Sequence, residues 1–430
     1  MHMLNNKENY KIHNNYNLVL SLFITFIPPS LVLGAAIMEF FIILSCVFFF
    51  FLNLKKIGLN YYKNNFFYIF CLFCFFLILS SLLSNDIFNS LRNTAFYFRF
   101  GILALIICYL LDNYEKFKSF FFNSLFVTLI IVISYSFLEF FFSNISNTAR
   151  ISGLFGDELI QGSFLLRIIP IFFIFSFYNK EKIFAKKFSL LVFYIILSSS
   201  FILIILSGER SAVFLTILSI LLSFLFFKLN FRKIILYSLL ILTFSTSTFY
   251  FYPKTKERII NQTIKQVFFI QDRAGYNIGK KINIFSEGHQ DHLESGFLMF
   301  QENYILGVGV RNFRIECKND IYKIVGKYPC STHPHNTYIQ LLSETGLIGF
   351  SFIVVFLLFI FLQIFVFYKK NFKQKRKFNI SLAACFIIIL VNLFPFMTSG
   401  SFFNNWLSTL YYIPIGLLLH ELNNEKLPND

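Results

Sequence analysis

Two histidines and a glutamate in the stretch 330–349, CSTHPHNTYIQLLSETGLIG, have side chains suited to acid–base chemistry. His333 and His335 flank a proline, which biases this segment toward an extended or turned backbone. Asn336 is a favourable helix cap, so a helix that carries Glu344 is expected to begin there. A lone histidine more often only bonds the backbone of its own loop. This pair, with its asparagine and glutamate, instead favours a functional site in which an imidazole acts as a base.

Arginines at two positions suggest a site for an anion. Arg150 begins RISGLFGDE, and Arg210 lies in LSGERSAVF at the expected start of an apolar helix. A guanidinium binds two phosphate oxygens at once, so a diphosphate would be a suitable partner. Snorkelling or a salt bridge to Glu209, Asp157 or Glu158 is the alternative. For Arg150 the two interpretations are equal, whereas for Arg210 the anion site is favoured.

A third candidate region is SEGHQDHLESGFLMFQENYILGVGVRNFR, residues 286–314. Its first part is predicted to be a helix with His289 and His292 on one face, and a glycine-rich turn with Arg311 and Arg314 follows. The histidines at 289, 292, 333 and 335 are a conceivable metal site. Two separated pairs lack the tight spacing of a metalloprotease helix, so no metal is predicted. The glycine run also lacks the strand and lysine of a phosphate-binding loop.

Two of the seven cysteines, Cys317 and Cys330, lie in this same polar region, and the other five lie in or next to apolar segments. Cysteines that face an oxidising compartment can pair, whereas cysteines inside a membrane behave as small apolar residues. A possible Cys317–Cys330 disulfide would clamp the chain just before the two histidines.

Long apolar segments must position all of these residues. The chain has 430 residues, of which 56% are hydrophobic and 14% charged, and its mean hydropathy is +0.65. The charged share is about half that of a soluble domain. Apolar runs long enough to cross a bilayer as helices recur, without the short alternating pattern of barrel strands. An all-α polytopic membrane protein with about 12 transmembrane helices is predicted. Its spans are 17–33, 36–53, 66–84, 95–112, 119–143, 163–178, 188–207, 211–229, 232–251, 347–368, 379–399 and 406–420.

Basic residues gather in alternate loops between these spans, as the positive-inside rule requires. They include Lys63, Lys116, Lys118, Lys180, Lys186, Lys187, Arg232 and Lys369. Both termini are therefore predicted to be cytoplasmic. Residues 252–346 then form a large periplasmic loop between helices 1–9 (residues 1–251) and helices 10–12 with a cytoplasmic tail (residues 347–430). Because the loop lysines account for most of the net charge of +16, the lipid bilayer is the expected partner and nucleic acid is not.

In kind and order, the motifs resemble those of the O-antigen ligase and O-antigen polymerase superfamily. HPHNTYIQLLSETGLIG is similar to the histidine signature of that superfamily. RISGLFGD, SGERSA and the segment from GHQDHL to GVGVRNF resemble its other motifs, so that the resemblance covers roughly residues 150–400.

The resemblance implies a C-type glycosyltransferase-like helical fold in the bacterial inner membrane. It also implies transfer of a glycan from a polyprenyl diphosphate carrier to an acceptor on the periplasmic face, without a cofactor or metal. His335 matches the superfamily's functional histidine and would be the base, and Arg210 matches its functional arginine and would hold the donor diphosphate. The other candidate substrate-binding residues are Arg150, His289, His292, Arg311, His333, Asn336 and Glu344. Where the superfamily tends to place an arginine at the start of the loop helix, this chain has His289. The replacements available are Arg273, Arg311 and Arg314.

An O-antigen ligase, which joins a finished glycan to lipid A–core, is the leading prediction. The O-antigen polymerase, which joins one lipid-linked repeat unit to another, and a protein O-oligosaccharyltransferase are alternatives with the same donor chemistry. A transporter is the non-enzymatic alternative. Transporters usually place ionisable residues near the midplane of broken helices, whereas these spans carry few charges, Arg99 and Arg167 among them.

Overall fold

The computed structural model describes residues 2–54, 58–142, 150–183, 186–227, 231–268, 285–373 and 379–426. Every element within these ranges is a helix, which confirms the predicted all-α class. The helices of the main bundle are α1 (His2–Thr25), α2 (Ile27–Leu33), α3 (Ala35–Leu54), α4 (Asn65–Leu82), α6 (Phe98–Asn113), α7 (Lys116–Phe142), α8 (Gln161–Tyr178), α10 (Lys187–Leu206), α11 (Arg210–Phe226), α12 (Phe231–Phe251), α17 (Thr337–Lys373), α18 (Ile380–Asn392) and α19 (Asn405–Lys426). The shorter elements are η1 (Leu59–Tyr62), α5 (Ile87–Thr94), η2 (Gly153–Glu158), α9 (Lys180–Ile183), α13 (Pro253–Lys256), the π-helical turn η3 (Glu257–Asn261), α14 (Gln262–Phe268), α15 (Glu287–Glu302), α16 (Phe313–Glu316) and η4 (Asp320–Val325).

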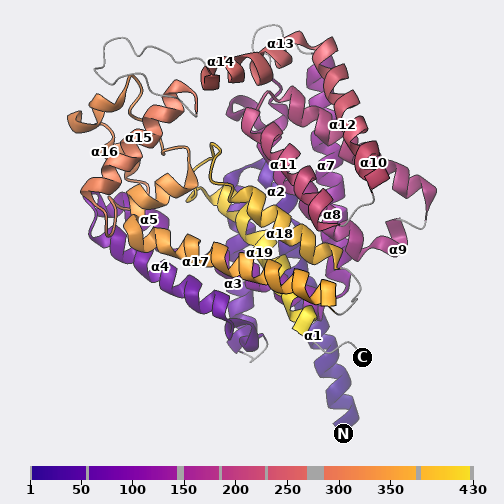
Figure 1. Cartoon of the computed structure of the whole chain (residues 1–430). Coiled ribbons are helices and arrows are strands. Elements are labelled where there is room, and N and C mark those ends of the chain that lie inside the picture. The colour runs from indigo at the N-terminus through magenta and orange to yellow at the C-terminus, as the bar shows by residue number, and fades with distance from the viewer. Residues whose placement is uncertain are drawn as a thin grey trace.

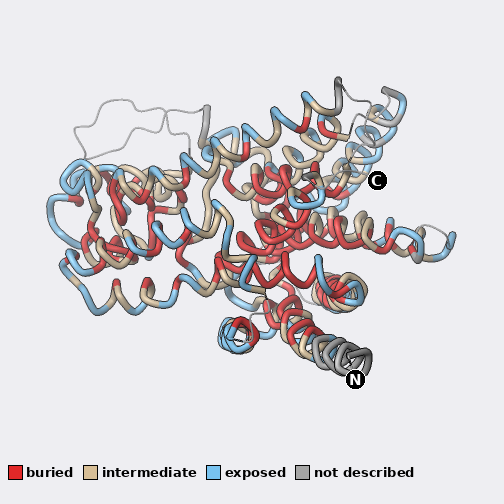
Figure 2. Tube along the Cα trace, turned by 90° about the horizontal axis from the view of Figure 1, so that it is seen from below, coloured by how far each residue is buried: buried red, intermediate tan, exposed pale blue. Residues whose placement is uncertain are grey.

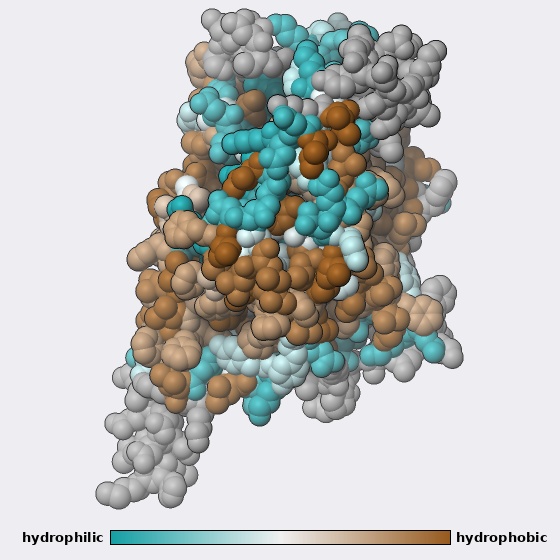
Figure 3. Space-filling view, turned by 90° about the vertical axis from the view of Figure 1, so that its left-hand side faces the viewer, coloured by the Kyte–Doolittle hydropathy of each residue, from teal (hydrophilic) through white to brown (hydrophobic). Residues whose placement is uncertain are grey.

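The bundle has the surface of a membrane protein. Figure 3 shows, on one face, a hydrophobic belt between a broad hydrophilic rim and a thinner one. In the described part of the chain, nine helices are long and apolar enough to cross a membrane, and α11 and α18 are shorter apolar helices at two further predicted spans. Helix α19, at the last predicted span, is not among the nine. The chain is therefore a multi-pass membrane protein, and the number of about 12 crossings stays a prediction.

The two ends of the bundle differ in what they carry. Both chain termini lie at one end, which we call the terminus end (Figure 1). The opposite end, the loop end, carries α5 and the elements from α13 to α16. The loop end is the face that the pattern of lysines predicts to be periplasmic, and that orientation stays a prediction.

Helices α6, α8, α18 and α19 form the centre of the bundle, and Figure 2 shows buried residues concentrated along the central helices. Large side chains such as Phe100, Phe164 and Phe386 are fully buried there. A helix that is apolar on all sides is expected in such a position, because it can be surrounded by other helices as well as by lipid. The centre is thus a rigid support for whatever lies at the loop end.

Two arginines that the sequence places in the spans, Arg99 and Arg167, lie toward the loop end and not at the midplane. Arg99, the second residue of α6, donates to both carboxylate oxygens of Glu39 at 2.8 and 3.2 Å. Glu39 also lies in a predicted span and was overlooked as the partner of this arginine. Arg167, in the second turn of α8, donates to the Ser163 carbonyl at 3.0 Å. The Arg99–Glu39 pair joins α6 to α3, whereas the Arg167 contact lies within α8, and the two do not line up as an ion path.

Helix α17 has a break at Gly346. Gly346 has φ +63°, and a Cβ at this position would lie 2.2 Å from the Ile305 carbonyl oxygen. The break lets the loop pair with the exposed backbone, since the Leu347 amide donates to the Tyr304 carbonyl at 2.8 Å and the Gly309 amide to the Glu344 carbonyl at 3.0 Å. The part of α17 before the break, residues 337–345, therefore belongs to the loop end, and the remainder belongs to the bundle.

The loop end has a small apolar core of its own, separate from that of the bundle. It consists of Met299, Val308, Phe313, Cys317 and Tyr322, with Leu298 and Cys330 packed against it. Burial of these side chains by the hydrophobic effect gives the segment 285–336 a defined shape. That segment is therefore a folded unit, and it positions the histidine motif.

Substitution of Gly346 by alanine is expected to destabilise the docking of the loop onto α17. The new methyl would collide with backbone at residues 305–306, in addition to the cost of about 1–2 kcal/mol for a left-handed L residue. Gly156 has φ +57°, and nothing lies within 4 Å of the position that a methyl group would take there, so Gly156→Ala isolates the conformational cost alone. Thermal unfolding midpoints of the detergent-solubilised variants should fall further for Gly346→Ala than for Gly156→Ala. Equal losses would contradict the proposed contact.

Candidate functional site

The histidine segment 330–336 is held by the connection between α18 and α19. The Ser399 amide donates to the His335 carbonyl at 2.8 Å, and the Ser399 carbonyl lies 3.2 Å from His333 Nε2. The Asn336 side chain donates to the Pro395 carbonyl at 2.8 Å. Its oxygen accepts the amides of Tyr338 and Ile339, so Asn336 caps α17 as the sequence predicts. The segment is thus fixed on both its backbone and its side chains.

His335 itself has a left-handed backbone, with φ +57°. Non-glycine residues rarely adopt this conformation, and such strain tends to persist where the surrounding structure imposes it, often at functional sites. The preceding residue, Pro334, prevents the segment from continuing as a helix. The turn places the imidazole beside His289 and His292 of α15, and Ser331 Oγ of the same segment lies 3.1 Å from His335 Nε2.

Helix α15 brings two further histidines over this segment. It packs closely against α17, since a Cβ at Gly296 would lie 2.7 Å from Ile339 and 3.2 Å from Pro334. At the start of α15, Ser286 Oγ lies 2.6 Å from His289 Nδ1 and fixes that ring. The predicted helix with His289 and His292 on one face is therefore present, and this face is turned toward the histidine motif.

The imidazole of His335 and three others form a cluster. Its ring centroid lies 4.1 Å from that of His333, 4.8 Å from His289 and 5.2 Å from His292. In the described part of the chain, His292 Nδ1 is buried without a hydrogen-bond partner. No group of three or more histidine, cysteine or carboxylate side chains suited to a metal ion is found among the described residues. The four imidazoles lie together as neighbouring bases.

The environment keeps these imidazoles neutral. Burial, followed by the neighbouring His333, His289 and His292, lowers the pKa of His335 to about 2. Burial, with His292 and Arg210 nearby, lowers the pKa of His289 to about 4. The pKa of His333 also falls to about 4, mainly through burial. These imidazoles are therefore unprotonated at neutral pH, and His335 becomes a stronger base only where a bound anion raises its pKa.

Arg150, Arg210 and Arg258 form a cluster around the turn before α11. Arg150 donates to the Ser207 carbonyl at 3.0 Å and to the Leu159 carbonyl at 2.9 Å. Arg258, on η3, donates to the Gly208 carbonyl at 3.0 Å. A Cβ at Gly208 would lie 3.0 Å from Arg258 and 3.1 Å from Arg150, so the two side chains flank this glycine. Burial, and then the positive charge of Arg258, lowers the pKa of Arg150, which shows that the guanidinium groups are close enough to repel one another.

Glu209 holds this turn in place, but it does not cancel the positive charge of the arginine cluster. Its carboxylate accepts the Gly162 amide at 2.6 Å and the Ser163 hydroxyl at 2.7 Å, so it caps the start of α8. Burial raises the pKa of Glu209, while these hydrogen bonds and Arg150 oppose the rise. The predicted alternative in which Glu209 pairs with Arg210 is not the arrangement found, since Arg210 Nη1 instead donates to the Gln266 side chain on α14 at 2.5 Å.

The arginine cluster and the histidine cluster adjoin one another. The positive charge of Arg210 is one of the causes that lower the pKa of His289, and the His289 ring lies 4.8 Å from that of His335. Residues far apart in the chain thus lie near one another at the loop end. His289 is the link between the two clusters.

Arg311 and Arg314 lie on another side of the histidines. Arg311 has φ +60° and donates to the Phe403 carbonyl at 3.1 Å. Burial, and then the neighbouring Arg314, lowers the pKa of Arg311, and the positive charge of Arg314 also helps to lower the pKa of His333. The Nε atoms of both arginines are buried without a hydrogen-bond partner among the described residues. They therefore form a second cationic edge of the site.

Glu344 does not join the histidines in any described contact. It is fully buried, and its carboxylate accepts a hydrogen bond from Gln340 at 2.9 Å. Gln340 also donates to Ser401 Oγ at 2.9 Å and accepts the Phe402 amide at 2.8 Å. These residues form a polar layer beneath the histidine segment, so a part for Glu344 in substrate binding stays a prediction without a supporting contact.

Cys317 and Cys330 form the disulfide that the sequence suggests, with their Cα atoms 5.0 Å apart. The bond joins the end of α16 to the residue that begins the histidine segment. The other five cysteines are free. The disulfide therefore fixes one side of the segment, and the α18–α19 connection fixes the other.

Sequence reasoning missed two parts of this site. Arg258 was not singled out, and among the suggested replacements for the missing superfamily arginine, Arg273 lies outside the described residues. The only local signal for Arg258 was a cation at the predicted outer boundary of a span, in PKTKERIIN. The role of Ser399 was also missed, because nothing in the sequence near it indicates that it bonds a segment more than 60 residues away.

Comparisons with known proteins agree with the motifs. A protein-family model described as O-antigen ligase matches residues 192–354, a range that includes α11, α15 and the histidine segment. A search of curated proteins found no match. The family match supports an O-antigen ligase-like or polymerase-like function in general and does not separate the two.

The number of reactive thiols shows directly whether the disulfide is present. A thiol-reactive polyethylene glycol applied to the denatured, unreduced chain should add to the five free cysteines, and prior reduction should raise the number to seven. The double variant Cys317→Ser/Cys330→Ser should show five additions under both conditions. It should also be less stable by about 3 kcal/mol, the value typical of a loop of roughly this length. Seven additions without a reductant would contradict the disulfide.

Proposed function

We propose that this chain, which belongs to the O-antigen ligase and O-antigen polymerase superfamily, is a glycosyltransferase of the O-antigen ligase type. It moves a glycan from a polyprenyl diphosphate carrier to an acceptor hydroxyl at the loop end, on the periplasmic face. The observation that carries the proposal is the junction of the arginine cluster with the histidine cluster through His289.

Arg150, Arg210 and Arg258 are suited to the donor diphosphate. Their mutual repulsion and burial make the empty cluster unfavourable, and an anion with two phosphates would relieve both costs. Guanidinium groups bind phosphate oxygens bidentately and remain charged at any physiological pH. Arg258 then supplies the additional phosphate contact that His289 does not.

His335 is suited to be the general base. A sugar hydroxyl is a weak nucleophile until a base removes its proton, and this imidazole is neutral and has three other imidazoles around it. His289, His292 and His333 are then positioned to hold the acceptor sugar and to restrict the orientation of the base. Ser331 is a hydrogen-bond partner that steadies the His335 ring.

The reaction is a single displacement. The acceptor oxygen forms a bond to the anomeric carbon of the donor sugar while its proton passes to His335. The bond from that carbon to the diphosphate oxygen breaks, and its electron pair leaves with the diphosphate. Fixed guanidinium charges stabilise the developing negative charge, which is commonly the largest contribution to catalysis. Direct attack from the opposite face inverts the anomeric centre.

Arg311 and Arg314 are suited to anionic groups on the acceptor. Arg314 is close enough to His333 to lower its pKa, Arg311 is a neighbour of Arg314, and the buried Nε atoms of both lack partners among the described residues. Donor and acceptor would then approach the base from two cationic edges. This arrangement fits a ligase and a polymerase equally, because both join two lipid-linked substrates.

The transporter alternative has little support in the described residues. Arg99 pairs with Glu39, and Arg167 lies near the start of α8. The histidine and arginine clusters gather at the loop end, where a lipid-linked glycan would be handled at the membrane boundary, and the Asp112–His420 pair lies at the terminus end.

Substitution of the base or of the diphosphate site is expected to slow glycan transfer. His335→Ala should lower kcat by about 10²–10⁴, the usual range for a general base. Arg210→Ala and Arg258→Ala should instead weaken donor use, each by about 1.5–3 kcal/mol in kcat/KM. Lys265→Ala is the matched control, because Lys265 is an exposed cation one helix away from Arg258. Transfer from a purified lipid-linked donor, at equal protein levels, measures these effects.

Lipopolysaccharide from a strain that lacks the chain identifies the reaction. Loss of a ligase leaves unattached polymer on the carrier, whereas loss of a polymerase leaves single-repeat caps. Full activity in both His335→Ala and Arg210→Ala would refute the enzyme proposal. An effect of Lys265→Ala equal to that of Arg258→Ala would refute the specific diphosphate site.

The pH dependence of kcat/KM should reveal the lowered pKa of His335. A histidine with an ordinary pKa of about 6.5 would lose about tenfold in its basic form by pH 5.5. Because the pKa of His335 lies far below that range, its basic form persists and kcat/KM should stay flat between pH 8 and about pH 5.5. The profile of kcat/KM is the relevant one, since it reports the free enzyme. A tenfold acid limb near pH 6.5 would contradict a buried neutral base.

A further inference from the structure

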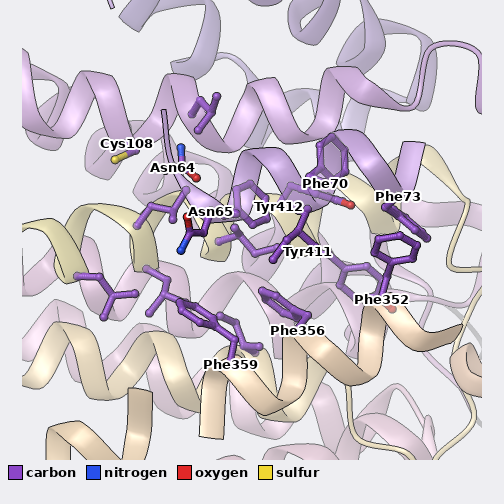
Figure 4. A pocket seen from close by; sticks show the side chains of 18 of the residues that line it. Asn64, Asn65, Phe70, Phe73, Cys108, Phe352, Phe356, Phe359, Tyr411 and Tyr412 are labelled. Atoms are coloured by element: carbon purple, nitrogen blue, oxygen red, sulfur yellow. The ribbon is translucent and has the colours of Figure 1, made fainter. Parts of the chain in front are cut away.

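A large cavity lies away from the site described above. It has a volume of about 770 Å³ and lies between α4, α6, α17, α18 and α19. This volume is in the range of about 300–1,000 Å³ that is typical of ligand sites. Figure 4 shows Phe352, Phe356 and Phe359 of α17 along one side of it, with Tyr411 and Tyr412 opposite. None of the four clustered histidines or three clustered arginines lines it.

The cavity is polar at one end and apolar at the other. At the terminus end it is lined by Asn60, Tyr61, Lys63, Asn64, Asn65, Asp112, Asn113 and Asn423. Toward the loop end it is lined mainly by Phe70, Phe73, Leu341, Phe352, Phe402 and Tyr411, with the Asn392 amide among them. An occupant that matches this gradient has a polar head at the terminus end and a hydrocarbon tail that points toward the loop end.

The length of the cavity fits one leaflet. The lining residues of α19 run from Tyr411 to Asn423, which is about 18 Å along the helix. One leaflet contributes about 15 Å, half of the roughly 30 Å hydrocarbon thickness. The side chains of Ile69 and Val355 line the cavity and are also 40% and 46% exposed, so the cavity opens to the lipid phase beside α4 and α17. A chain from a neighbouring lipid can therefore reach it sideways.

The charges at the polar end favour an anionic head. Lys63 is exposed there, as are Asn60 and Asn65, and Asn65 is the first residue of α4, whose free backbone amides attract anions. The one carboxylate among the described lining residues, Asp112, is bonded to His420 and to the Tyr61 hydroxyl. That contact leaves Lys63 as the charge available to a headgroup.

The carrier's prenyl tail fits this cavity poorly. A tail that descended from the diphosphate site would place hydrocarbon against the amides at the terminus end, which would desolvate them without hydrogen bonds. The buried layer of Gln340, Glu344 and Ser401 also lies between the histidine segment and the Leu341 and Phe402 side chains at the top of the cavity.

We infer that this cavity binds an anionic phospholipid of the leaflet at the terminus end, with one acyl chain inside and its headgroup at Lys63. The lipid fills space between α4 and α17 and joins them. The site is separate from the proposed glycosyl transfer, and its occupancy is measured without any transfer assay.

Native mass spectrometry of the full chain, released from mild detergent, tests the inference. The wild-type chain should retain about one phospholipid with an anionic headgroup, identified after extraction. Val355→Trp places a large ring at the mouth, and occupancy should fall by about tenfold, which corresponds to about 1.4 kcal/mol. Leu358→Trp is the matched control, because Leu358 is similarly exposed on α17 but does not line the cavity, and it should retain the lipid.

The headgroup is tested separately. Lys63→Gln should lower the preference for anionic over zwitterionic lipid by about fivefold, as expected for one lysine near a membrane surface. Lys116→Gln, which removes an exposed lysine at the same end, should leave the preference unchanged. Recovery of polyprenyl diphosphate in place of phospholipid would overturn the inference. So would equal retention in Val355→Trp and Leu358→Trp, or a headgroup preference that Lys63→Gln leaves unaltered.

Discussion

The site depends on the desolvation of positive charge at the membrane boundary. Arg150, Arg210 and Arg258 lie close together around one turn, and His289 lies between them and the other clustered imidazoles. Burial and mutual repulsion disfavour further protonation, so the histidines stay neutral while the guanidinium groups stay charged. The desolvation of positive charge therefore produces both the neutral base and the anion site. A bound diphosphate would partly offset this repulsion. It would thereby raise the basicity of the nearest imidazoles when a proton has to be accepted.

Such a cluster needs a scaffold that does not relax. The histidine segment is tied to α16 by the Cys317–Cys330 disulfide and to the α18–α19 connection through Ser399. Helices α18 and α19 belong to the buried centre, so the rigidity of the bundle reaches the His335 backbone directly. The left-handed conformation of His335 persists because both sides of the segment are held. Local strain and global packing are thus parts of one arrangement.

The sequence revealed what hydropathy and local capping determine. Apolar runs located the spans, Asn336 located the start of α17, and the paired loop cysteines located a disulfide. The partners of these elements depend on tertiary packing, which no local pattern encodes. Arg258 reaches the Gly208 carbonyl only because η3 folds back over the start of α11, and Ser399 reaches His333 only because α18 and α19 lie under α17. Glu344 lies in a buried layer, so the part in substrate binding that its motif suggested stays a prediction.

That buried layer also separates the two sites of the molecule. Gln340 bonds Glu344, Ser401 and Phe402 at once, and so closes the space between the histidine segment above and the apolar cavity below. A lipid tail in the cavity would press on α4 and α17, and the loop end also contacts α4 because Ser80 donates to the Leu306 carbonyl at 2.7 Å. The cavity can therefore affect the loop end only through the positions of these helices. For this reason, a single bundle can bind a lipid in one leaflet and carry out chemistry at the other.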